Sequence, residues 1–187
     1  MTLDGVMQGP ASPHEDTRDG FTQGGWTVPY MDEVIGAEAG KGIAEGEGGG
    51  MLFGRRTYEK MESAWRNGPA DSPFTKVMNE RRKYVASRTL EEPLDWQNST
   101  LLKGDAVETV ARLREEGEGN TVILGSGELI QSLLPHGLID VITLAIFPVT
   151  LGAGHRLFPQ GGAAASFELV DVKPTTTGVL LATYNLR

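Results

Sequence analysis

The 187-residue chain has no cysteine and only three histidines, His14, His136 and His155, which lie far apart. Without cysteine the chain can form neither disulfides nor thiolate metal sites. Histidines scattered in this way also give no ligand spacing for a metal ion, so we expect no bound metal.

Long apolar runs are missing as well. No stretch approaches the roughly 18 apolar residues of a membrane span, and the N-terminus has no basic segment followed by an apolar one. Acidic residues outnumber basic ones by 25 to 17, which argues against a nucleic-acid partner because a polyanion needs clustered Lys and Arg. We expect a cytoplasmic protein that forms a single domain over 1–187, without a membrane partner.

Glycine is plentiful, and it interrupts an apolar run where a strand is expected to become a helix. The run 121–124 ends at Gly125, Ser126 and Gly127, and a helical pattern starts near Glu128. The glycines let the backbone turn tightly and approach a ligand, while the first N–H groups of a helix have no partner within it. The segment therefore predicts either a phosphate-binding corner or a plain strand-to-helix connection.

A second corner has the same design. The apolar run 51–53 leads to Gly54, which is followed by Arg55, Arg56 and Thr57. Guanidinium groups bind phosphate oxygens through charge-assisted hydrogen bonds, and cations at a helix start oppose the helix dipole unless an anion is near. We expect the two corners to face one anionic ligand. The alternative is that the arginines pair with surface carboxylates.

Strands and helices alternate along the chain, which is typical of an α/β protein with a mostly parallel sheet. Pro29 starts a helical pattern that extends to about Ile43, and the tract 45–50 is expected to be a loop. A turn near 176–178 predicts an antiparallel hairpin. Strands are expected at 51–53, 83–87, 100–102, 121–125, 141–149, 167–172 and 179–186, and further helices up to 65, at 71–79, at 105–116 and from 128.

Five short motifs follow one another along the chain. They are Leu-Asp-Gly at 3–5, Gly-Arg-Arg-Thr-Tyr-Glu at 54–59, Ser-Arg-Thr at 87–89, Leu-Gly-Ser-Gly at 124–127 and Pro-Val-Thr-Leu-Gly-Ala-Gly at 148–154. Together they resemble the dihydrofolate reductase superfamily, and within it the branch related to the reductase domain of riboflavin biosynthesis. The resemblance implies a three-layer α/β fold with a mostly parallel central sheet, an antiparallel C-terminal hairpin and helices on both faces.

The resemblance also implies a cofactor, NADPH, and the residues that bind it. The two corners would hold the pyrophosphate, and the segment 87–89 would lie at the 2′-phosphate, which favours NADPH over NADH. A strained or cis peptide bond is implied between Gly125 and Ser126, whereas Glu128 departs from relatives with a basic residue there. The expected cofactor-binding residues are Gly54, Arg55, Arg56, Thr57, Ser87, Arg88, Thr89, Gly125, Ser126, Gly127, Glu128 and Leu129.

Three acids are candidates for the catalytic group. The resemblance implies a carboxylate on the first helix, where Asp32 and Glu33 lie, and it places Asp4 near the substrate side of the fold. Trp26 and Tyr30, just before that helix, are the expected substrate-binding residues. An acid at a helix start has a second interpretation, because it stabilises the helix dipole.

These expectations describe a reductase that transfers hydride from NADPH to a small heterocyclic or otherwise polarised unsaturated substrate. The proton would come from one of the acids, from water or from His155, since an imidazole can donate near neutral pH. Two alternatives stay open: a pyrimidine reductase of the riboflavin pathway, and a non-catalytic nucleotide-binding or sensing module. The long apolar strands 141–149 and 179–186 and the family's habit imply a homodimer.

The start of the chain departs from the family pattern. Relatives have a full sheet strand before the motif at 3–5, whereas this sequence has only Met1 and Thr2 there. We expect the first strand to be truncated, leaving a seam between the strands 121–125 and 143–148. Buried backbone groups without partners are costly, so such a seam would be filled, distorted or wet.

Overall fold

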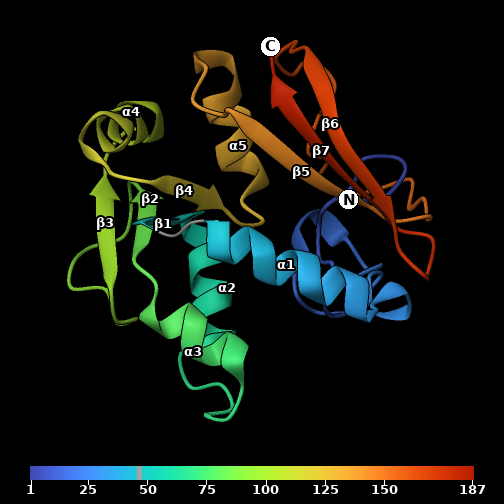
Figure 1. The fold of residues 1–187 in the computed structure, drawn as a ribbon, viewed down its shortest axis with the longest axis horizontal. Coiled ribbons are helices and arrows are strands. Elements are labelled where there is room, and N and C mark those ends of the chain that lie inside the picture. The colour runs from blue at the N-terminus through green and yellow to red at the C-terminus, as the bar shows by residue number, and fades with distance from the viewer. Residues whose placement is uncertain (46–47) are drawn as a thin grey trace. The chain divides into compact units, whose positions relative to one another are not determined.

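The computed structural model describes residues 1–45 and 48–187, and the chain forms two compact units (Figure 1). Unit 1 consists of Met1–Glu38 and Ile139–Arg187, and unit 2 of Ala39–Leu138. The expected single domain over 1–187 concerns how these units are assembled and stays a prediction. None of the described helices is long and apolar enough to cross a membrane.

Unit 2 is built on a four-stranded parallel sheet with the strand order β3-β2-β1-β4. Its strands are β1 (Gly48–Gly54), β2 (Lys83–Ser87), β3 (Ser99–Lys103) and β4 (Asn120–Ile123). Its helices are α2 (Arg55–Trp65), α3 (Pro73–Glu80), α4 (Ala106–Glu116) and α5 (Gly127–Leu133), and a 3-10 turn, η3 (Leu134–His136), follows α5. Ser72 caps α3 and Asp105 caps α4 through their side-chain oxygens, as their residue types predict.

β1 and β4 lie side by side at the point where the order of the strands across the sheet reverses. From β1 the chain continues to β2 and β3 on one side, whereas β4 lies on the other side of β1. Leu52 pairs with Ile123, and Gly54 with Ala86, so the three parallel strands end at the same edge. Open α/β sheets bind ligands outside the carboxyl ends of their strands at such a switch point.

The expected loop at 45–50 is wrong at its C-terminal end, because Gly48–Gly50 form the start of β1. Gly48 and Gly50 pair with Asn120 and Thr121 of β4. A Cβ atom on Gly49 would lie 2.2 Å from the Asn120 carbonyl oxygen, and only glycine permits this approach. Residues 46 and 47 of the tract lie outside the described residues.

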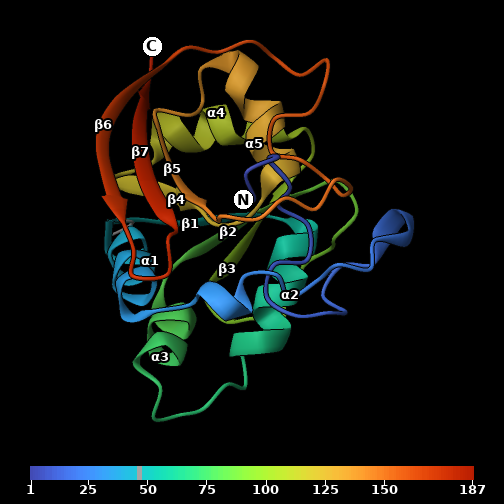
Figure 2. The same cartoon turned by 90° about the vertical axis from the view of Figure 1, so that its right-hand side faces the viewer.

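Unit 1 contains a three-stranded antiparallel sheet with the order β5-β7-β6, whose strands lie side by side in Figure 2. The strands are β5 (Val141–Ile146), β6 (Phe167–Pro174) and β7 (Leu180–Leu186). Val179 and Leu181 pack with Trp26 and Phe147 in the core of this unit. The hairpin near 176–178 and the α/β class are confirmed. Among the described residues, the antiparallel strands do not extend the parallel sheet as an edge but form a second sheet.

Helix α1 (Glu33–Glu45) begins later than the pattern from Pro29 predicts. Pro29 lies in a separate 3-10 turn, η2 (Val28–Tyr30), and Asp32 is the residue that starts the helix. The Asp32 carboxylate accepts a hydrogen bond from the Ile35 N–H at 2.9 Å, which satisfies one of the free donors of the first turn. A second 3-10 turn, η1 (Arg18–Gly20), lies in the otherwise irregular segment before it.

The first residues of the sequence lie along the end of β5. The Met1 carbonyl accepts from the Phe147 N–H at 2.8 Å, and Thr2 forms a parallel bridge with Phe147. Within the part of the chain that is described, β4 is an edge strand of the sheet in unit 2, and β5 is an edge strand of the sheet in unit 1. The expected seam between the strands 121–125 and 143–148 stays a prediction.

Lys83 is fully buried at the start of β2, beside the end of α3. Its ammonium group donates to the carbonyl oxygens of Met78 at 2.9 Å and Arg81 at 2.8 Å, and lies 4.6 Å from the centre of the Trp96 ring. The last carbonyl groups of a helix have no partner within it, and a cation there suits the helix dipole. Lys83, which lies on β2, therefore caps the C-terminal end of α3.

We predict that Lys83→Met lowers the free energy of unfolding by about 1–3 kcal/mol, because buried carbonyl groups lose their donor. Urea unfolding measures this change. Lys76→Met is the matched control: Lys76 lies on α3, is 71% exposed and pairs with Glu80 at 3.9 Å, so its loss should cost less than about 0.5 kcal/mol. Equal stability of Lys83→Met and the parent protein would contradict this role.

Candidate functional site

The first corner joins β1 to α2 at the carboxyl edge of the parallel sheet. Gly54 stands at the N-cap position of α2 with no side chain to cap it. The first N–H groups of α2, on Arg55, Arg56 and Thr57, therefore point out of the helix without intrahelical acceptors. A helix start of this kind offers several donors and a partial positive charge to an anion.

The second corner joins β4 to α5 and is tied to the first by a hydrogen bond. The Ser126 hydroxyl is buried, accepts from the Gly54 N–H at 3.0 Å and donates to the Leu124 carbonyl at 3.3 Å. Gly125 has φ +62°, and its carbonyl accepts from the Gly127 N–H at 3.1 Å in a very tight turn. Ser126 thus holds the corners together, and its hydroxyl is committed to backbone groups.

The peptide bond between Gly125 and Ser126 is not cis. Among the described residues the cis bond lies at Glu92–Pro93. The expectation of a cis bond in the glycine corner is therefore wrong. The tight turn is centred on Ser126 (φ −88°, ψ 68°), and Gly125 enters it with a positive φ, which costs a residue without a Cβ atom little.

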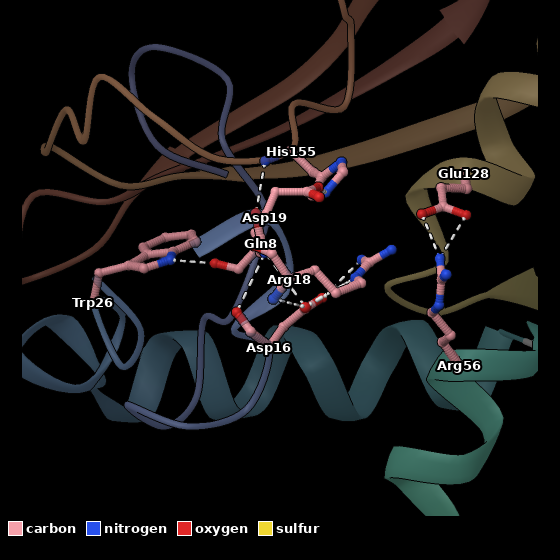
Figure 3. Close-up of polar contacts among 8 residues, drawn as sticks. All are labelled: Gln8, Asp16, Arg18, Asp19, Trp26, Arg56, Glu128 and His155. Atoms are coloured by element: carbon pink, nitrogen blue, oxygen red, sulfur yellow. Dashed lines mark hydrogen bonds and ion pairs between the residues drawn. The ribbon is translucent and has the colours of Figure 1, made fainter. Parts of the chain in front are cut away.

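Both arginines of the first corner pair with carboxylates. Arg55 binds both oxygens of Glu59 at 3.0 and 3.1 Å within α2, and Arg56 binds both oxygens of Glu128 at 2.9 and 3.2 Å (Figure 3). These are the ion pairs that the alternative expects, and the assignment of the arginines to a phosphate ligand stays a prediction. In each pair one guanidinium nitrogen donates to both carboxylate oxygens, and guanidinium donors also bind phosphate oxygens, so both groups suit an anionic partner.

The segment at the end of β2 lies at the same edge. The Ser87 hydroxyl is buried and accepts from the backbone N–H groups of Thr89 and Leu90, both at 3.1 Å, which folds the segment into a turn. Arg88 is exposed and has no hydrogen bond or ion pair with the residues that the structure describes. Of the three residues expected at the 2′-phosphate, Arg88 is the one with a free charged group.

Asp32 is engaged in structural hydrogen bonds. Besides capping α1, its carboxylate accepts from the Thr176 hydroxyl at 2.6 Å and the Thr176 N–H at 2.9 Å. The Thr176 hydroxyl, followed by the Ile35 N–H, lowers the pKa of Asp32. Asp32 therefore fits the helix-stabilising interpretation better than the role of a proton donor, and the neighbouring Glu33 is exposed.

Asp4 organises a loop in unit 1. Its carboxylate accepts from the Thr2 hydroxyl at 2.6 Å and from the backbone N–H groups of Gly152 at 2.8 Å and Leu151 at 3.2 Å. The Thr2 hydroxyl is the main reason that the pKa of Asp4 falls to about 2, and the two backbone donors add to it. An acid in this state is ionised at neutral pH and has no proton to donate.

The two aromatic residues expected to bind substrate belong to the packing of unit 1. Trp26 is only 8% exposed, and its indole N–H donates to the Gln8 carbonyl at 2.9 Å. Trp26 and Tyr30 both meet the Phe147 ring edge-on, with ring centres 5.3 and 6.0 Å away. Tyr30 keeps more exposed surface than Trp26, so it is the better placed of the two to meet a ligand.

Figure 3 shows a polar network around Gln8 that no pattern in the sequence predicts. The buried Gln8 side chain accepts from the His155 N–H at 2.9 Å and donates to the Arg18 carbonyl at 3.1 Å. The His155 ring lies 2.9 Å from the Asp19 carboxylate. The network fixes the irregular segment before α1, because the Gln8 amide makes hydrogen bonds to the backbone of two distant loops, at Arg18 and at His155.

Unit 2 also has an open groove of about 610 Å³ that is distinct from the corners. It is lined by β2, β3 and α4, including Tyr84, Leu101 and Arg112. None of the residues predicted to bind cofactor or substrate lines it. The described residues contain no group of three or more His, Asp and Glu side chains that could hold a metal ion.

The sheet order, the paired corners and the separate antiparallel sheet define an α/β protein with the dihydrofolate-reductase-like fold. The chain belongs to the RibD C-terminal domain family, which it matches over residues 1–181. The resemblance seen in the five sequence motifs is thereby confirmed.

Three proteins illustrate what this chain is similar to. An uncharacterized protein of Bacillus subtilis, YyaP, is 27% identical over 138 residues, 72% of each chain. A candidate riboflavin biosynthesis protein from Shewanella sp. PV-4 has a TM-score of 0.70 at 23% identity, over 100% of this chain and 95% of that one. A deaminase/5-amino-6-(5-phosphoribosylamino)uracil reductase from Thermotoga maritima has a TM-score of 0.62 at 15% identity, over 100% of this chain and 54% of that one.

We predict that Asp4→Asn destabilises the protein by about 1–2 kcal/mol at pH 7, since an amide replaces the hydrogen-bonded carboxylate. The pKa of Asp4 is lower in the folded state than in the unfolded state, so its contribution is present above about pH 4. It should be lost as the pH falls through about 2. Unfolding curves of both proteins between pH 7 and 2 measure this difference.

The exposed Asp71 provides the matched control, because Asp71→Asn removes a carboxylate without these donors and should leave stability unchanged. If Asp4→Asn kept full stability and yet abolished turnover, Asp4 would be catalytic and the structural interpretation would fail.

Proposed function

We propose that the protein is an NADPH-dependent reductase that transfers hydride to a small heterocyclic or otherwise polarised unsaturated substrate. The observation that carries this proposal is the pair of corners at the switch point, joined by the hydrogen bond between Gly54 and Ser126. Free N–H groups and guanidiniums at one edge of a parallel sheet are the donors that a pyrophosphate needs. Membership of the RibD C-terminal domain family supports it.

The residues of the chain would bind and orient the cofactor, which supplies the hydride when bound. Arg55, Arg56 and the first N–H groups of α2 would hold the pyrophosphate, while Arg88 would bind the 2′-phosphate. Ser126 would act indirectly, by fixing the distance between the corners through Gly54. Gly125 would let the backbone of the second corner come close to the cofactor.

The proton source in this proposal is water. Asp4 and Asp32 both accept several hydrogen bonds, and these bonds lower the pKa of each carboxyl group. Both are therefore ionised at neutral pH, so they would position loops instead of donating a proton.

Two other functions each have an observation in their favour. The Thermotoga maritima relative is named as a uracil reductase, which favours a pyrimidine substrate. The structural use of Asp4 and Asp32 favours a nucleotide-binding module without turnover. Measuring NADPH oxidation with pterins, aminopyrimidines and enones separates these functions: oxidation with aminopyrimidines alone supports the pyrimidine reductase, and binding without oxidation supports the module.

We predict that NADPH binds more tightly than NADH and that Arg88→Ala removes most of the difference. A charge-assisted contact to phosphate contributes about 1.5–3 kcal/mol, roughly a ten- to hundredfold change in Kd. Fluorescence titration of both cofactors measures it. Arg112→Ala, which removes an exposed arginine from the groove, should leave both affinities unchanged. Equal affinities of the parent protein for NADPH and NADH would refute the 2′-phosphate assignment.

We also propose that the protein forms a homodimer through β6. This strand is an edge strand, and Leu169, Val170 and Val172 on it are 53%, 56% and 48% exposed. Apolar side chains on an open strand edge are typical of an interface, because the edge also offers unpaired backbone groups.

Light scattering at micromolar concentration should give the mass of a dimer. Val170→Lys places a charge in the expected contact and should shift the mass to that of a monomer, whereas the isosteric Asp171→Asn on the same strand should keep the dimer. A monomeric parent protein would contradict the proposal.

A further inference from the structure

The two arginines that open α2 are held by carboxylates of different origin. Arg55 pairs with Glu59, one turn along its own helix, whereas Arg56 pairs with Glu128 from the start of α5. In each pair one guanidinium nitrogen meets both carboxylate oxygens, and both pairs are partly exposed, so each can open. Of these two ion pairs, the one between Arg56 and Glu128 runs from one corner to the other.

The Glu128 carboxylate occupies the place at Arg56 where an anionic ligand would bind. Its two oxygens lie 2.9 and 3.2 Å from one guanidinium nitrogen, as Figure 3 shows. Two residues before it, Ser126 holds the neighbouring corner against Gly54. A ligand that binds both corners must therefore displace this carboxylate from Arg56 and then remain close to its negative charge.

Displacement depends on the charge of the ligand. A carboxylate held on the same chain has a high effective concentration, so a singly charged anion gains little by replacing it. A pyrophosphate group carries two negative charges and can bind Arg55, Arg56 and the free N–H groups of α2 together. The ion pair would thus discriminate against small monoanions.

We propose that Glu128 is a specificity-determining residue of the anion site, an internal competitor that weakens binding and reserves the site for multiply charged phosphates. This inference rests on the proposed function, because it assigns the cofactor's pyrophosphate to the corner that Glu128 covers. Glu128 sets the affinity of the site, and Arg56 is the group for which it competes.

The test is a titration of Glu128→Gln with NADPH and, separately, with inorganic pyrophosphate at low ionic strength. Affinity for both should rise about three- to tenfold, and the gain should shrink in high salt because exposed charges are screened. Glu62→Gln is the matched control: it makes the same change of charge on α2, but on a carboxylate that pairs with Arg66, which is not assigned to the anion site, and its gain should stay below about twofold. In the double variant Arg56→Ala/Glu128→Gln the gain should disappear.

Each outcome decides the inference. Equal gains for Glu62→Gln and Glu128→Gln would reveal a general effect of charge and overturn it, as would no gain for Glu128→Gln. A gain for pyrophosphate alone, with no NADPH binding by any variant, would support the competitor and overturn the proposed function. If no variant bound either probe, both would be overturned.

Discussion

The hydrogen bond from the Gly54 N–H to the buried Ser126 hydroxyl is the contact on which the candidate site depends. It joins residues that are 72 positions apart, at the ends of two neighbouring parallel strands. Because both helices start at this point, the bond fixes the distance between the guanidiniums on α2 and the turn before α5. An anion can meet both sets of donors only while that distance is kept.

Backbone geometry at a few glycines makes this arrangement possible. Gly49 lets β1 approach β4 closely, since a Cβ atom there would collide with the Asn120 carbonyl. Gly125 adopts a positive φ, which allows the chain to leave β4 and enter α5 within a very tight turn. The sheet order, the close strand pair and the turn therefore act together to place the two corners at one edge.

Much of this could be predicted from local sequence. The strand at 83–87 and the helices after Ser72 and Asp105 follow from apolar patterns and capping residues, which act over a few positions. The strand at 141–149 is shorter than predicted, ending at Ile146 before Pro148, which has no N–H for a ladder. The part of the glycine tract in β1 could not be predicted, because composition does not reveal the partner strand.

The roles of Asp4 and Asp32 depend on residues that are far away in the sequence, so they cannot be predicted from the sequence alone. Asp32 accepts from Thr176, 144 positions away, and Asp4 accepts from Leu151, 147 positions away. Sequence spacing shows an acid near a helix start or in a motif, but it does not show which donors the fold brings to it. The corners were easier to predict, because glycines, arginines and strand-to-helix transitions are all local features.

The central claim is that the joined corners, together with Arg88 after β2, bind the cofactor, and that the groove of unit 2 does not. The most direct test is an NADPH titration of ¹⁵N-labelled protein followed by amide chemical shifts. The largest changes are expected at Gly54, Arg56 and Gly127, with little change in the groove at Tyr84 and Leu101. Largest changes in the groove, with the corner amides unmoved, would contradict the account.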